Sequence, residues 1–332
     1  MREARKTMIV GEELRLWLGN HIRQRATQAK IDALGAQWNR GSVHQHFVAT
    51  VANASPISAA TIAEAFRAMF ADDAWIDVLI GELANAMRDD PYFVPPFRAL
   101  KNDIHAGLLV YEDAHVMVAA GVTRALELAT HKQGKQGGSI NFSGQITVLK
   151  FVHGGGAMLS FWEAPRIADD FTAAGAGSCR LVDRRRISDG EILVIDGRSQ
   201  SYVVDHAGAN LLLLQAAIKV DQAPLAVEYD AATGAYLGSS ATDDADSRVQ
   251  MIATLVRKLG HDGAFGAVAT LLDHPRFFVR WHAMRELIGI DARAALPHLT
   301  AMTARDPHAD VRAAAQATLE RVRAGLGEKE AA

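Results

Sequence analysis

The sequence is organised around residues 187–218, ISDGEILVIDGRSQSYVVDHAGANLLLLQAAI. Apolar residues recur in it at every second position, as in Tyr202 and Val204 and again in Leu211 and Leu213. A period of two is typical of strands that bury one face. An Asp-Gly pair and a His-Ala-Gly run separate the apolar runs, and glycine favours turns because it adopts positive φ without a Cβ clash. The stretch therefore predicts three strands joined by tight turns.

The segments on either side continue this pattern. Short apolar runs alternate with Gly-rich turns over residues 105–240, and many short strands with such turns are typical of a closed antiparallel β-barrel or jelly roll. The candidate strands outside the central stretch are 108–111, 114–122, 139–142, 145–152, 157–162, 178–182, 225–229 and 234–237. We expect one β-rich domain over 105–240.

Residues 1–104 predict a helical region instead. Leu14, Leu18 and Ile22 recur every four residues, which predicts one amphipathic helix over 12–24 with these residues as its apolar stripe. Ser58 is a good N-cap for a second helix, and a third is expected over 74–88. The N-terminus has no sustained apolar run, so no signal peptide is expected and the cytoplasm is the predicted location.

A repeat marks the last part of the chain, 241–332. Arg248, Arg280 and Arg312 are 32 residues apart (280 − 248 and 312 − 280). Apolar positions share this offset, as in Leu255, Leu287 and Leu319. A fixed period near this length predicts stacked helix pairs, an α-solenoid. The segment 306–319, DPHADVRAAAQATL, resembles the HEAT repeat.

The HEAT resemblance implies a surface that binds a protein or peptide partner. Phe277, Phe278, Trp281 and Arg285 are the candidate partner residues, since aromatic side chains and arginine concentrate binding energy. The alternative is that these aromatic residues pack on the β-rich domain, and the sequence favours neither reading.

A second resemblance lies in the central stretch. Residues 190–200, GEILVIDGRSQ, resemble the second signature of the cupin superfamily, with Ile-Asp-Gly in place of its Pro-x-Gly turn and Gln200 at its histidine position. Glu163 can stand for the glutamate of the first signature, but Ala157 and Leu159 occupy its histidine positions. The resemblance implies a cupin-like barrel in which the usual metal ligands are missing.

This departure bears on function. A catalytic ion needs three or four convergent N or O ligands, which alanine and leucine do not supply. We therefore expect a metal-free barrel without a cofactor, which acts as a non-enzymatic binding or scaffold protein for a small molecule or peptide segment. Arginine in such an interior would suit a carboxylate or phosphate. The candidate interior residues are Glu163, Arg184, Arg186, Arg198, Gln200 and Tyr202.

The alternative is a metal-dependent cupin-type oxygenase or isomerase with unusual ligands. These would come from His115, His131, His153, Glu163 and His206, which lie in or near the predicted barrel. Histidine and carboxylate side chains are common ligands of iron, manganese and zinc.

Composition limits the remaining possibilities. A formal net charge of −3 gives no electrostatic reason to expect nucleic acid or an anionic membrane as partner. The lone Cys179 excludes an intrachain disulfide and a Cys-rich metal site. Edge strands of such barrels pair between subunits, so a homodimer is a further expectation. The predicted class is α+β, with a helical region, a cupin-like β-barrel or jelly roll, and HEAT-like repeats.

Overall fold

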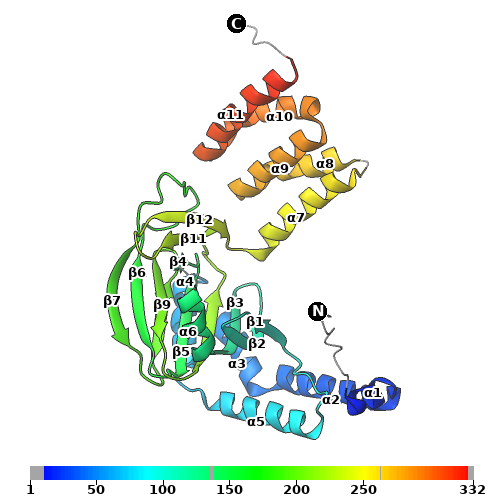
Figure 1. Cartoon of the computed structure of the whole chain (residues 1–332), viewed down its shortest axis with the longest axis vertical. Coiled ribbons are helices and arrows are strands. Elements are labelled where there is room, and N and C mark those ends of the chain that lie inside the picture. The colour runs from blue at the N-terminus through cyan, green and yellow to red at the C-terminus, as the bar shows by residue number, and fades with distance from the viewer. Residues whose placement is uncertain (1–10, 135–137, 262, 328–332) are drawn as a thin grey trace, which may run out of the picture.

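The computed structural model describes residues 11–134, 138–261 and 263–327 (Figure 1). Its N-terminal part is helical, as predicted. The helices are α1 (Glu12–Leu18), α2 (His21–Arg40), α3 (Ser42–Ala52), α4 (Ala59–Met69) and α5 (Ala74–Asp89). No helix within the described residues is long and apolar enough to cross a membrane.

The predicted apolar stripe at the N-terminus is wrong in one respect. Leu18 and Ile22 are 54% and 81% exposed, and α1 buries no residue. The cause is that α1 ends at Gly19, its C-cap. The Asn20 side chain then accepts a hydrogen bond from Arg23 N and caps the start of a new helix, α2. Because one continuous helix does not form, the three positions do not share a single buried face.

Six strands form the first β-layer. They are β1 (Arg98–Lys101), β2 (His105–Glu112), β3 (Val116–Thr123), β5 (Ile146–His153), β8 (Ile192–Asp196) and β10 (Leu211–Ile218). They are antiparallel and lie in the order β1-β2-β3-β10-β5-β8. Strand β1 lies inside the region 1–104 that was expected to be helical, and it pairs with β2 of the β-rich segment. The division of the chain into three domains stays a prediction.

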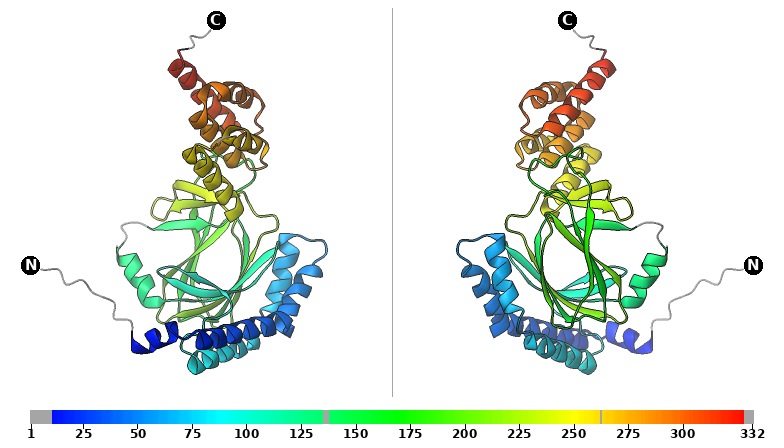
Figure 2. Two further views of the ribbon diagram at one scale, coloured as in Figure 1. Left: turned by 90° about the vertical axis from the view of Figure 1, so that its right-hand side faces the viewer. Right: turned by 90° about the vertical axis from the view of Figure 1, so that its left-hand side faces the viewer.

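The second layer consists of two three-stranded sheets, with orders β12-β11-β4 and β7-β6-β9. The strands are β4 (Ser139–Phe142), β6 (Met158–Glu163), β7 (Arg180–Arg186), β9 (Gln200–His206), β11 (Leu225–Asp230) and β12 (Tyr236–Ala241). Ser201 Oγ donates to Asn141 O at 2.5 Å and joins β9 to β4. Figure 2 shows the two layers facing one another, and we call them together the β-sandwich. Closure into a continuous barrel stays a prediction, because the sheets are hydrogen-bonded separately.

Side chains from both layers fill the space between β5, β8 and β10 on one side and β6 and β9 on the other. Leu149 and Phe151 of β5, Leu159 of β6 and Leu211 of β10 are fully buried there, and Tyr202 of β9 packs against them. We call this the interior core. The opposite face of the six-stranded sheet packs against α3, α4 and α5 in a separate core.

The C-terminal helices are α7 (Asp244–Leu259), α8 (Ala264–Ala269), α9 (Phe277–Ile290), α10 (Ala292–Arg305) and α11 (Ala309–Gly325), with a 3-10 turn at Thr270–Asp273. The 32-residue period has a structural cause. Arg280 Nη1 donates to the carbonyls of His274 and Pro275, six and five residues earlier. Arg312 Nη1 makes the same contacts with the carbonyls of Asp306 and Pro307. Each arginine therefore ties the start of its helix to the preceding loop.

The turn between β8 and β9 supplies a first test. A Cβ at Gly197 would collide with Ser143 Oγ and lie 2.5 Å from Gln145 O. We expect Gly197→Ala to lower the free energy of unfolding by about 1–3 kcal/mol, since the close-packed backbone has to move. Chemical denaturation measures this. Gly238→Ala is the matched control, because an added Cβ there meets no atom within 4 Å; equal losses in the two variants would contradict the close approach.

Candidate functional site

Of the predicted interior residues, Tyr202 is the one that lies in the interior core. Desolvation between the layers raises the pKa of Tyr202 to about 12, so the phenol stays neutral. Gln200 lies at the start of the same strand and is exposed, and its Oε1 accepts a hydrogen bond from Asp196 N at 3.1 Å. Around Tyr202 the interior core consists of buried and partly buried apolar side chains that pack against one another.

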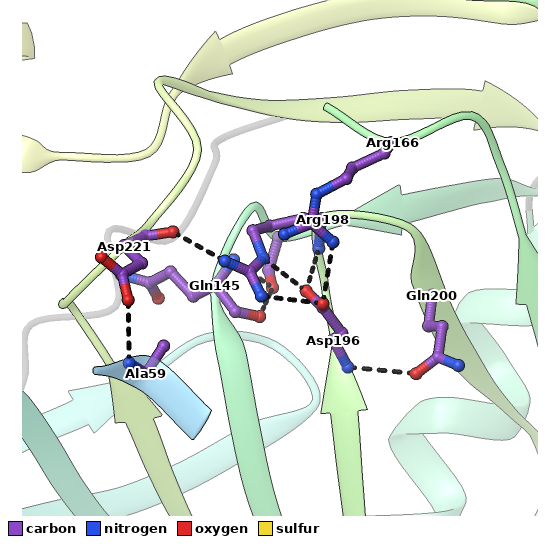
Figure 3. Close-up of polar contacts among 8 residues, drawn as sticks. Ala59, Gln145, Arg166, Asp196, Arg198, Gln200 and Asp221 are labelled. Atoms are coloured by element: carbon purple, nitrogen blue, oxygen red, sulfur yellow. Dashed lines mark hydrogen bonds and ion pairs between the residues drawn. The ribbon is translucent and has the colours of Figure 1, made fainter. Parts of the chain in front are cut away.

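Arg198 lies in a network at the edge of the β-sandwich (Figure 3). Its Nε and Nη2 donate to the two carboxylate oxygens of Asp196 at 2.7 and 2.9 Å, and its Nη1 donates to Asp221 O at 3.1 Å. The Asp221 carboxylate in turn accepts from Ala59 N at 3.0 Å. The hydrogen bonds with Asp196 raise the pKa of Arg198. This network joins two loops of the β-sandwich to α4. The Arg198 guanidinium group is therefore used for contacts within the fold.

Arg184 faces the outside of the sheet β7-β6-β9, away from the interior core. Its Nε lies 2.8 Å from Asp205 Oδ2. The other Asp205 oxygen accepts from Ser160 Oγ at 3.0 Å, and Ser160 Oγ accepts from Trp162 Nε1 at 3.1 Å. From α6 (Ala125–Gly134), Lys132 Nζ donates to Asp205 O at 3.1 Å. This chain of contacts fixes the carboxylate and leaves the faces of the indole ring free of hydrogen bonds.

These side chains line a cavity of about 490 Å³, which we call the outer pocket. Its walls include Trp162, Leu181 and Val203, and Leu181 is 45% exposed although it is apolar. The cations of Lys132 and Arg184 and the carboxylate of Asp205 give the polar side of the pocket a formal charge of +1. Desolvation lowers the pKa of Lys132, and Asp205 partly opposes this shift. An apolar wall beside a net positive charge is suited to a small organic anion.

A second cavity of about 590 Å³ lies where the β2–β3 hairpin meets the start of α7. Its charges are already compensated within the chain. Glu112 accepts from Lys219 at 2.8 Å and lies 3.2 Å from Arg98, and the Asp243 side chain caps α7. The second cavity is thus lined by paired charged side chains where the β-sandwich meets the first C-terminal helix.

Two further predicted interior residues lie on the surface. Glu163 lies at the end of β6 and forms an ion pair with Arg180 at 2.6 Å. Arg186 is exposed at the end of β7 and is not part of the outer pocket. The sequence could not place these side chains, since alternation along a strand does not say which face is the interior.

The alternative metal ligands are dispersed in the structure. His115 and His153 lie beside opposite ends of β10, and the strand register puts Glu163 and His206 at opposite ends of the β6–β9 pair. The side chain of His131 lies outside the described residues. Within the described part of the chain, no three His, Cys, Asp or Glu side chains converge as an ion-binding group.

The candidate partner residues divide into two groups. The Phe277 ring stacks on His308 with centroids 3.8 Å apart, and Phe277 and Phe278 pack against the β-sandwich. Trp281 packs inside the helical array, whereas Arg285 is exposed on its surface. The structure thus favours the packing alternative for Phe277 and Phe278, and His308 Nε2 adds a contact to Phe171 O at 3.1 Å.

Comparison with known proteins supports both resemblances. Residues 236–320 match the family model of HEAT repeats, and no curated protein matches the chain. The HEAT-like nature of the C-terminal helices is therefore confirmed.

Among solved structures, the chain is similar to a cupin domain from Bordetella pertussis Tohama I, with 13% identity, a TM-score of 0.23, and coverage of 36% of this chain and 99% of that one. It is also similar to a sugar phosphate isomerase of the cupin superfamily from Silicibacter pomeroyi, with 10% identity, a TM-score of 0.23, and coverage of 43% and 79%. A third is ectoine synthase from P. lautus, with 9% identity, a TM-score of 0.22, and coverage of 36% and 67%. The expected likeness to cupins is found, but at these TM-scores it carries no argument about function.

Proposed function

We propose that the chain is a non-enzymatic binding protein. Its β-sandwich holds a small organic anion in the outer pocket, and its HEAT-like helices contact a protein. The observation that carries this proposal is the outer pocket itself, where the ring of Trp162 lies beside the cations of Lys132 and Arg184. In the interior core, by contrast, buried apolar side chains of the two layers pack against one another.

The geometry suggests how the ligand lies. A flat apolar body stacks on Trp162 and contacts Leu181 and Val203, which line the pocket. Its carboxylate, sulfonate or phosphate then meets Arg184, whose side chain contacts Asp205 through Nε, so that both Nη groups are available as donors among the described residues. A guanidinium group favours such anions because it can donate two parallel hydrogen bonds.

Two fluorescent probes test the chemistry of the ligand. Anilinonaphthalene sulfonate has an aromatic body and a negative charge, whereas N-phenylnaphthylamine has the same body without the charge. We expect the sulfonate to bind more tightly, and Arg184→Gln to weaken its binding about tenfold while leaving the neutral probe unaffected. Fluorescence titration measures both affinities.

Arg186→Gln is the matched control, since it removes the same charge two residues along β7 but outside the outer pocket. An unchanged melting temperature would show that the variants are folded. If the two probes bound equally, or if Arg186→Gln weakened binding as much as Arg184→Gln, the proposal of an anion site in the outer pocket would fail.

A further inference from the structure

Helix α7 exposes a continuous apolar face. Met251 and Ile252 are neighbours, Leu255 and Leu259 follow one and two turns later, and the four side chains are 64%, 58%, 53% and 71% exposed. Large apolar side chains so close together on one helix mark an interaction surface, whereas scattered ones do not. We call this face the α7 stripe.

The 32-residue repeat explains why this face has no cover. The counterparts of Leu255 are Leu287 and Leu319, which are 0% and 4% exposed. Leu287 packs against Ala253 and Val268 of α7 and α8, and thus against the preceding helix pair. Stacked repeats bury their apolar faces on their neighbours.

Leu319 likewise packs against Met284 and Leu299 of α9 and α10, the helix pair before it. For α7 the preceding element is the β-sandwich, with α7 following directly after β12 (Figure 1). The side chains of the stripe stay exposed to solvent. The stripe is therefore the face on which one more helix would stack.

The charges around the stripe indicate what covers it. Asp244 and Lys258 are both exposed and lie seven residues before and seven residues after Met251. In an antiparallel pair of α7 helices centred on Met251, Asp244 of each copy lies opposite Lys258 of the other. The face is thus complementary to itself, as an interface with twofold symmetry requires.

Helix dipoles favour the same arrangement, because the antiparallel pair sets the positive end of each helix beside the negative end of the other. We propose that two copies of this chain form a dimer through the α7 stripe. Each copy supplies the missing neighbour for the first HEAT-like repeat of the other. This interface differs from the pairing of edge strands that the sequence suggested.

The mass in solution, measured by light scattering during gel filtration, tests the dimer. We expect the full chain to have twice the mass of a single chain. The double variant Met251→Glu/Leu255→Glu buries four carboxylates in the interface and should raise the dissociation constant about a hundredfold or more. Val78→Glu is the control, because Val78 is 63% exposed on α5, away from the stripe.

A charge exchange separates a specific interface from loss of folding. Asp244→Lys alone should weaken the dimer, and adding Lys258→Asp should restore it, since the two charges then attract again across the interface. A monomeric wild-type chain would overturn the proposal. A dimer that persists in the double glutamate variant, or a charge exchange without recovery, would also overturn it. None of these results depends on ligand binding in the outer pocket.

Discussion

Replacing Arg280 by alanine is expected to unfold the HEAT-like helices at much lower denaturant concentration. Arg280 is 7% exposed, and its Nε and Nη2 each donate to one oxygen of Asp306 at 2.8 Å, while Asp306 is 6% exposed. Removing one partner of such a pair leaves a charge buried without compensation, which costs about 3–5 kcal/mol. The helical circular dichroism signal of the full chain, followed in urea, measures the loss.

Arg312→Ala is the control for this variant. Arg312 makes the equivalent bonds to two loop carbonyls but forms no ion pair with any carboxylate among the described residues. We expect it to cost about 1 kcal/mol, the usual value of a hydrogen bond. Equal losses in the two variants would mean that the buried ion pair contributes nothing beyond the contacts with the loop.

The ion pair also predicts a pH dependence. Burial by itself would raise the pKa of Asp306, but the hydrogen bonds from Arg280 and from His308 N outweigh it, so the pKa is lowered. A carboxyl with a lower pKa in the folded chain stabilises it fully above its unfolded pKa, about 3.9. The contribution is lost as the pH falls toward the folded value. The difference in free energy of unfolding between the wild-type and Arg280→Ala proteins should therefore shrink as the pH is lowered, which urea denaturation at several pH values measures.

Phe151→Ala is the second change with a large expected effect. Phe151 is fully buried in the interior core, between the two layers of the β-sandwich. Removing a buried aromatic ring costs about 3–5 kcal/mol, because the cavity it leaves is only partly refilled. Thermal unfolding measures this loss, and a gain in binding of the neutral probe N-phenylnaphthylamine would report the new cavity.

Phe161→Ala is the comparison on the opposite layer. Phe161 is partly exposed, and the guanidinium carbon of Arg185 lies 5.1 Å from its ring centroid. Its removal should cost less, since solvent and the arginine side chain can fill the space. If Phe151→Ala were nearly neutral, the interior would be loosely packed or open, and the filled interior core would be refuted.

The strands and the helical repeat could be predicted from sequence because their causes are local. A period of two identified the central strands, and the 32-residue offset identified the helices because each arginine repeats the same loop contacts. Helix α6 was missed inside the β-rich segment. The stripe of α1 was misjudged because Gly19 and Asn20 end one helix and start another.

The faces of the strands could not be predicted, and the candidate site depends on them. Arg184 and Arg185 alternate along β7, so one faces the outer pocket and the other faces Phe161 in the interior. Which of them points outward depends on the partner strands, which are distant in sequence. The exposure of Leu255 has the same kind of cause, since the repeat predicts a buried position and the missing preceding helix pair leaves it open.

The most direct test of the binding site is a crystal structure with para-iodobenzoate, an aromatic carboxylate whose iodine gives an anomalous signal. The proposed function predicts an iodine peak in the outer pocket, with the ring on Trp162 and the carboxylate at Arg184. A peak between the two layers of the β-sandwich, or a transition-metal peak held there by histidine and carboxylate side chains, would contradict it.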